Sequence, residues 1–98
     1  MAAPRQAKVD APPKPRKAIK PDYPMGARQR GEQGDVVLEI RVNERGSVDG
    51  VAVVSSCGHA ELDSAAVRAA MNASFTPARS ERGPVASTAR LTLTFRLR

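Results

Sequence analysis

The residues that could do covalent or metal chemistry in this chain are the single cysteine, Cys57, and the single histidine, His59. They stand two positions apart in the segment SSCGH, just ahead of a predicted helix. A thiol at a helix N-terminus can have a lowered pKa, so a reactive Cys57 is physically conceivable. A nucleophile also needs an orienting third group, and a metal site needs three or four ligands, but the sequence supplies neither beside this pair. The alternative interpretation is that Cys57 is a small residue in place of a serine.

The other polar residues show no pattern of a catalytic site. Carboxylates are scattered singly, mostly at turns and on a wet strand face, so no acid/base pair can be assigned. Gly26, Gly31 and Gly34 precede a predicted strand, whereas a phosphate-binding loop follows a strand and opens a helix. We therefore predict that the protein is not an enzyme and uses no cofactor or metal.

The charge of the chain is concentrated near its N-terminus. The 98 residues make one small domain at most, with a formal net charge of +6. Residues 1–22 hold six Lys and Arg against two Asp, and the remaining residues hold ten Arg against eight acids. Aromatic side chains are limited to Tyr23, Phe75 and Phe95, which are too few for the stacking platforms of single-strand binders. The sequence therefore gives little support to nucleic-acid binding.

The first twenty residues have the composition of a linker. Six of the eight prolines fall in the first 24 residues, interleaved with Lys and Arg. Such a segment cannot bury enough apolar surface to order itself and favours extended polyproline II. We predict that residues 1–20 are a disordered linker, either a tag remnant or the end of a stiff spacer, and that residues 21–98 form the domain. No stretch of about eighteen apolar residues and no apolar signal core are present, so we expect either a cytosolic protein or a piece without its anchor or signal.

Hydrophobic periodicity predicts the elements of the domain. Good helix formers before Gly31 predict a helix of one or two turns. Apolar and polar residues alternate in residues 35–43, which predicts a strand, and a turn at residues 43–46 leads to a Val-rich second strand in residues 47–56. The segment 59–74 carries helix signals with a stripe of small side chains, made of Leu62, Ala65, Ala66, Ala69 and Ala73. An exposed loop is predicted at residues 78–85, and strict alternation predicts a third strand within residues 86–98.

This order predicts an α+β fold, helix-strand-strand-helix-strand. The first two strands form a hairpin, and the helical crossover returns the third strand in the direction of the second. The third strand then pairs antiparallel with the first, which gives a three-stranded antiparallel sheet of order 2-1-3 with both helices on one face. The third strand is an edge strand that contains no proline and no acidic residue. Sheet edges usually carry features that prevent further strand pairing, because their free backbone groups template it. This edge is the feature that most needs a functional explanation.

Short motifs recur in a fixed order from about Lys20 to Arg98. They are Tyr23-Pro24, Ala27, Gly31, Gly34, Val36, Leu38, Val42, Gly46, Val48, Ser55-Ser56, Gly58, Leu62-Asp63, Ala65-Ala66, Phe75, Pro77-Ala78, Gly83-Pro84-Val85 and Phe95-Arg96-Leu97. In this order and spacing the chain resembles the C-terminal domain of the TonB family of energy transducers. It departs from the family pattern at Ala73, where Trp is frequent, and at Cys57, where Ser is common. The first departure removes a large anchoring side chain from the end of the helix.

The resemblance implies a partner and a location. TonB-like proteins have an inner-membrane helix that works with proton-driven ExbB/ExbD-type motor proteins, a Pro-rich periplasmic spacer and this domain at the far end. The domain captures the TonB box, a short N-terminal segment of an outer-membrane transporter, as a strand added to the third strand. By this resemblance we expect a periplasmic domain of a Gram-negative bacterium whose anchor lies outside the sequence. The sequence does not indicate which transporter or cargo is served.

The predicted partner-binding residues follow from the edge and from this resemblance. The backbone of the third strand is the predicted docking edge, and three residues that enter the domain beside it are candidate side-chain contacts. The set is Lys20, Asp22, Tyr23, Ser87, Thr88, Ala89, Arg90, Leu91, Thr92, Leu93, Thr94, Phe95 and Arg96. Tyr23 with Pro24 could instead fasten the chain to the core, and Arg90 and Arg96 could either select acidic neighbours or protect the edge. The alternative functions are a TolA-like envelope-integrity module and homodimerisation through the same sheet edge.

Overall fold

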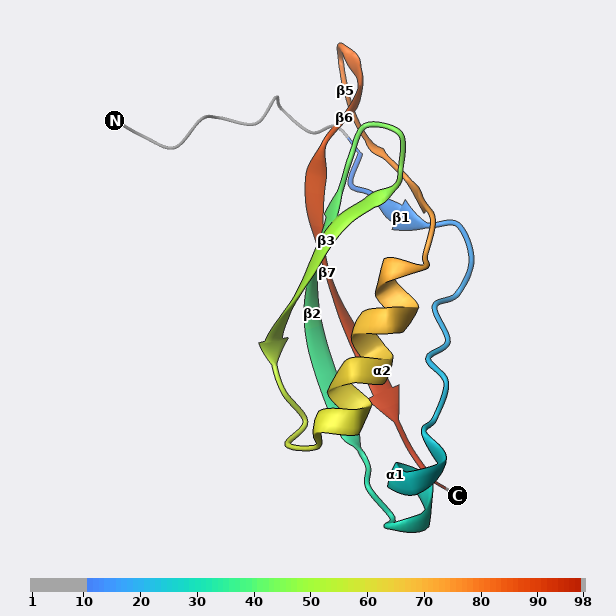
Figure 1. Ribbon diagram of the computed structural model, residues 1–98. Helices are drawn as coiled ribbons and strands as arrows, with labels where there is room; N and C mark the ends of the chain where they lie inside the picture. The colour runs from blue at the N-terminus through green and yellow to red at the C-terminus, as the bar shows by residue number, and fades with distance from the viewer. Residues whose placement is uncertain (1–10, 98) are drawn as a thin grey trace, which may run out of the picture.

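The computed structural model describes residues 11–97, which form one three-stranded antiparallel sheet with a helix packed across it (Figure 1). The helices are α1 (Met25–Gln29) and α2 (Ala60–Met71). The strands are β1 (Lys14–Pro15), β2 (Gly34–Val42), β3 (Val48–Ser55), β4 (Phe75–Thr76), β5 (Ala78–Ser80), β6 (Gly83–Val85) and β7 (Ser87–Phe95). The main sheet has the order β3-β2-β7, which confirms the predicted order.

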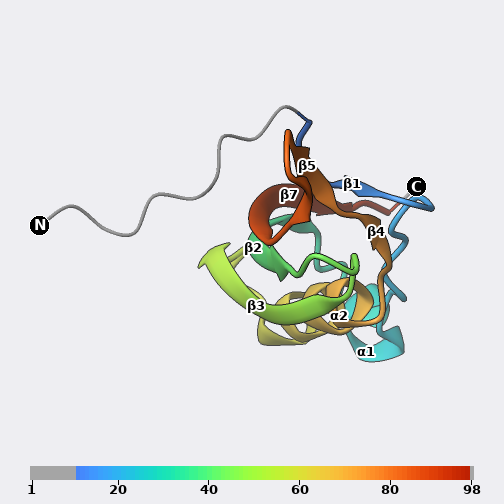
Figure 2. The same cartoon turned by 90° about the horizontal axis from the view of Figure 1, so that it is seen from above.

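The core lies between the central strand β2 and α2. The alternation predicted for residues 35–43 is confirmed, because every second side chain of β2 is buried: Val36, Leu38, Ile40 and Val42. The helix contributes small side chains that allow close packing on the sheet, and the buried ones are Leu62, Ala65, Ala66 and Ala70. The predicted stripe included Ala69 and Ala73, but these two side chains are only partly buried, and Ala70 is buried instead. Figure 2 shows both helices on the same side of the sheet, as predicted.

Two segments near the C-terminus differ from the prediction. Residues 78–85, predicted as an exposed loop, contain β5 and β6, which pair as a small hairpin. The third strand ends at Phe95 instead of continuing through Arg96, because β2 begins at Gly34, the partner of Phe95, and offers no further strand residues. Beyond it, the Leu97 N–H donates to the side chain of Gln33.

The turn between β2 and β3 forms as predicted and contacts β4. The side chain of Asn43 accepts hydrogen bonds from the N–H groups of Arg45 and Ser47. Gly46 has a φ of 85°, a conformation that glycine adopts without steric cost. Its carbonyl accepts a hydrogen bond from the Phe75 N–H, so this turn is tied to the segment that follows α2.

Residues 11–20, predicted as part of a disordered linker, lie against the domain. Strand β1 pairs antiparallel with β4, and Ala11 forms an isolated bridge with Arg79. The backbone groups of the segment after α2 supply partners that composition could not show, and Ile19 packs against the core. The prediction for residues 1–10 falls outside the described residues. Within the described part of the chain, no helix is long and apolar enough to cross a membrane.

Candidate partner-binding edge

Strand β7 is an outer strand of the main sheet. Within residues 11–97 it pairs with β2 and with no other strand. Figure 2 shows β2 beside β7, while β1 and β5, which are drawn near β7 in this view, belong to separate two-stranded sheets. The sequence prediction of an edge strand is therefore confirmed.

The two outer strands of the sheet differ in regularity. Strand β7 is in unbroken register with β2 over nine residue pairs, from Gly34 with Phe95 to Val42 with Ser87. The register between β2 and β3 shifts twice, once near each end of β3. Because irregular edges interrupt the ladder that an added strand needs, β7 is the better template for strand addition.

The hydrogen-bond pattern indicates which residues of β7 face outward. The Asn43 N–H donates to the Ser47 carbonyl across the hairpin, so the backbone groups of Asn43 point toward β3. Backbone direction alternates along a strand, so those of Val42 and every second residue before it point toward β7. Their partners in β7 are Ser87, Ala89, Leu91, Leu93 and Phe95. The backbone groups of Thr88, Arg90, Thr92 and Thr94 therefore point to the free side.

The side chains of β7 alternate as the sequence predicted. Leu93 and Phe95 are buried against the core, whereas Thr88, Thr92 and Thr94 are exposed on the opposite face. Arg90 is also exposed, and its guanidinium lies 3.6 Å from the carboxylate of Glu39 on β2. An exposed ion pair of this kind contributes little to stability, and both predicted roles of Arg90, selection of acidic neighbours and protection of the edge, stay predictions. Arg96 is exposed beyond the end of the strand.

Tyr23 lies at the C-terminal end of β7. Its ring meets the ring of Phe95 edge-on, its hydroxyl donates to the carbonyl of Glu32, and the Arg28 guanidinium lies 5.2 Å from its ring centroid. These contacts favour the interpretation that Tyr23 fastens the chain to the core. The two other predicted side-chain contacts, Lys20 and Asp22, line a groove beside α2. The structure therefore brings one of the three candidate side chains to the edge strand.

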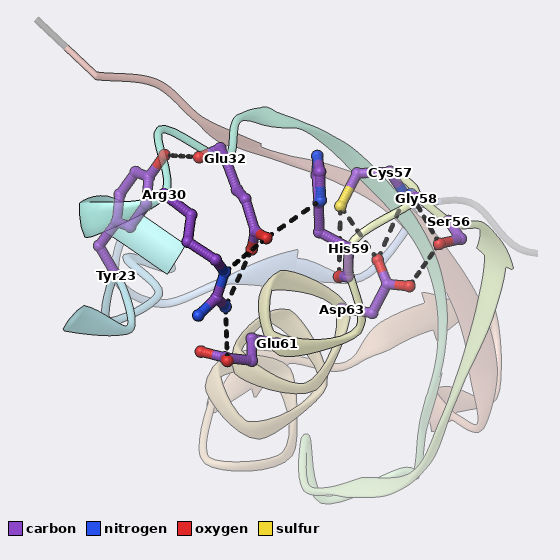
Figure 3. A network of polar contacts seen from close by, with 9 residues as sticks. All are labelled: Tyr23, Arg30, Glu32, Ser56, Cys57, Gly58, His59, Glu61 and Asp63. Carbon is purple, nitrogen blue, oxygen red and sulfur yellow. Dashed lines mark hydrogen bonds and ion pairs between the residues drawn. The ribbon is translucent and has the colours of Figure 1, made fainter. Parts of the chain in front are cut away.

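A network of polar contacts joins α1 to the start of α2 (Figure 3). Arg30 bonds to Glu32 at 2.9 Å and to Glu61 at 2.6 Å, and His59 Nδ1 lies 3.6 Å from Glu32. The hydrogen bond from Arg30 is the main reason that the pKa of Glu32 is lowered. No local pattern in the sequence predicts this network, because Arg30 and Glu61 are 31 positions apart.

The surroundings of Cys57 argue against a reactive thiol. Burial raises the pKa of the thiol, and the neighbouring Asp63 carboxylate, 3.3 Å from the sulfur, also raises it. The Ser56 hydroxyl and the Cys57 N–H donate to the same carboxylate, so Asp63 organises the loop ahead of α2 (Figure 3). A protonated thiol is a poor nucleophile and metal ligand. Among residues 11–97, no group of three or more His, Cys, Asp or Glu could hold a metal ion.

The chain is similar to known TonB proteins. The family model described as the Gram-negative bacterial TonB protein C-terminal region matches residues 19–97. Protein TonB of Neisseria gonorrhoeae is 45% identical over 56 residues, which are 57% of this chain and 20% of that protein. Protein TonB of Vibrio cholerae is 33% identical over 89 residues, which are 91% of this chain and 36% of that protein. The chain thus spans between a fifth and about a third of the length of these relatives.

A solved structure has a similar fold. The solution NMR structure of the Pseudomonas aeruginosa TonB C-terminal domain matches with a TM-score of 0.67 and 29% sequence identity, covering 90% of this chain and 89% of that one. The agreement of family model, sequence relatives and fold confirms the resemblance predicted from the motifs. The chain therefore belongs to the TonB C-terminal domain family.

Proposed function

We propose that this domain captures the TonB box of an outer-membrane transporter as a fourth strand on the free edge of β7. The observation that carries the proposal is the unbroken nine-residue register of β7, which leaves the outward backbone groups of four residues at regular spacing. Strand addition takes its affinity from main-chain hydrogen bonds and makes modest demands on sequence.

The expected affinity is modest. Each hydrogen bond contributes about 0.5 to 1.5 kcal/mol net, so the edge supplies several kcal/mol. Ordering a flexible peptide costs about 1 to 2 kcal/mol per residue, which offsets much of this gain. The result is weak, reversible capture, in which several bonds share a pulling load and must fail together.

The proposed role of the domain in the cell is energy transduction, without catalysis. Its partners are the transporter at the captured strand and ExbB/ExbD-type motor proteins that act through an inner-membrane anchor. In this proposal the domain lies in the periplasm, and the Pro-rich segment before it is the far end of a spacer. The support is family membership together with the free edge of β7.

A titration with a transporter peptide tests the proposal. Isotope-labelled protein is mixed with a TonB-box peptide, and amide shifts are followed by NMR. The largest shifts are expected at Thr88, Arg90, Thr92 and Thr94, with slowed hydrogen exchange of their amides as they gain partners. The same peptide with N-methylated backbone nitrogens is the control, because it keeps the side chains and loses the donors. A silent β7 with shifts on another surface would contradict the proposal.

A further inference from the structure

A groove lies on the helix side of the molecule, between residues 16–24 and α2. Figure 1 shows this segment running beside α2 from β1 down to α1. The groove has a volume of about 670 Å³. Its lining includes three alanines: Ala65 and Ala69 lie on one face of α2, and Ala73 follows the end of this helix. Small side chains leave room for an occupant that brings apolar groups of its own.

The rim of this groove is strongly basic. Arg16, Lys17 and Lys20 line one wall and Arg68 the other, against a single carboxylate, Asp22. Within residues 11–97, the four ion pairs involve only Arg30, Glu32, Glu61, His59, Arg90 and Glu39. The groove cations are therefore not neutralised by carboxylates of the described chain. Unneutralised charge around an apolar floor attracts an acidic partner and orients it.

The segment that forms one wall of the groove also has a free backbone. Both ends of this segment form backbone hydrogen bonds. The Arg16 N–H donates to the Ser74 carbonyl, and the Pro24 carbonyl accepts from the Arg28 N–H. Between them, residues 17–22 make no backbone hydrogen bond with the rest of the described chain. Apart from Pro21, which has no N–H, this segment lies outside any helix or strand and offers backbone donors and acceptors that could pair with an extended chain. This distinguishes a peptide occupant from a compact small anion, which would use the cations alone.

We propose that this groove docks an extended, acidic segment of a partner protein. Carboxylates of the segment meet Lys17, Lys20 and Arg68 at the rim, and its small apolar side chains rest on Ala65, Ala69 and Ala73. The site is separate from the free edge of β7, and the inference does not rest on the proposed function. The domain then has two peptide-binding surfaces, one selected by backbone pairing and one by charge.

The test uses a synthetic ten-residue peptide that alternates glutamate with valine, capped at both ends and titrated into labelled protein. Amide shifts are expected at residues 16–24 and 65–74, with β7 unchanged. The same peptide with glutamine in place of glutamate is expected to bind at least about tenfold more weakly, which corresponds to a loss of rim attraction. Equal binding of the two peptides, no binding, or shifts away from the groove would overturn the proposal.

Matched protein variants separate the groove from general charge attraction. One double variant carries Lys17→Glu and Arg68→Glu. The control double variant carries Arg45→Glu and Arg82→Glu, which change the net charge by the same amount at two exposed turn positions. The first is expected to weaken binding about tenfold or more and the second by less than about threefold. Equal weakening by both would overturn the proposal. Ala69→Leu fills the floor without a change in charge and is also expected to weaken binding, which keeps the test decisive if the charge variant does not fold.

Discussion

The ring of Tyr23 meets the ring of Phe95 edge-on, with the centroids 5.5 Å apart and the ring planes at 89°. The two residues are 72 positions apart, so this contact fixes the start of the domain to the end of its edge strand. Edge-to-face aromatic pairs are a favoured geometry and stabilise beyond their buried area. The position of Tyr23 therefore affects β7 through Phe95.

Substitution of Tyr23 separates its structural role from peptide contact. Tyr23→Ala is expected to lower the free energy of unfolding by about 2 to 4 kcal/mol, because a large packed ring is lost. Tyr23→Phe keeps the ring and loses only the hydrogen bond to Glu32, which costs about 1 kcal/mol. Urea denaturation measures both values. Peptide affinity is expected to be unchanged in Tyr23→Phe, and a clear loss of affinity in this variant would assign the hydroxyl to the binding surface.

Proline substitution in β7 tests which amides face outward. Thr92→Pro removes an outward donor and is expected to abolish peptide capture while the domain stays folded, since an edge strand tolerates proline on its free side. Leu93→Pro removes a donor that pairs with β2 and is expected to unfold the domain or destabilise it by about 3 kcal/mol or more. Thr92→Ala is the matched control and should bind normally. NMR spectra and peptide titration of the three variants are the measurements, and capture that survives Thr92→Pro would refute the outward assignment.

Gly46 is expected to be the most sensitive glycine of the turns. Its φ is 85°, and a Cβ at this position would collide with the carbonyl oxygen of Phe75. Gly31 has a φ of 69° with open space around it, so it shares the backbone conformation without the collision. Gly31→Ala is expected to cost about 1 to 2 kcal/mol for a left-handed L-residue, and Gly46→Ala clearly more. Thermal unfolding of the two variants compares them, and equal losses would show that the contact with Phe75 gives way without cost.

The pH dependence of stability is expected to include a contribution from Asp63. Burial opposes its ionisation, but hydrogen bonds from the Ser56 hydroxyl and the Cys57 N–H prevail, and the pKa of Asp63 is lowered. A carboxyl with a lowered folded pKa stabilises the fold above its unfolded pKa, near 3.9, and this stabilisation is lost as the pH falls through the folded value. Asp63→Asn should therefore be less stable than the parent at pH 7 and lose less stability on acidification to pH 3. The measurement is the urea midpoint of the parent and of Asp63→Asn at pH 7 and at pH 3. Equal losses of stability in the two proteins on acidification would exclude Asp63 as a source of acid sensitivity.

The same variant is expected to change the chemistry of Cys57. Burial holds the pKa of the thiol above its usual value, and Asp63 adds to this effect. Alkylation by iodoacetamide should accordingly be slow at pH 7. In Asp63→Asn the pKa should fall and the reaction should become faster at pH 8. A folded Asp63→Asn protein that alkylates more slowly than the parent would contradict this account.

The sequence by itself determined the two helices, the three strands of the main sheet and the order of these elements along the chain. The alternation in β2 and β7 and the small-residue stripe of α2 are local patterns, because side-chain direction repeats every two residues in a strand and about every 3.6 in a helix. Together with the direction of the helical crossover, these patterns predicted the β3-β2-β7 sheet and the edge position of β7. The family resemblance rested on the same motifs.

The tertiary structure decided what depends on contacts between distant segments. Strand β1 exists because Phe75 and Thr76 offer backbone partners to Lys14 and Pro15, which a Pro-rich composition does not reveal. The contact of Tyr23 with Phe95, the pairing of Arg30 with Glu61 and the groove between residues 16–24 and α2 arise in the same way. Hydrogen bonds, burial and charge neutralisation act through space, so their partners are chosen by the folded chain and leave no periodic signal in the sequence.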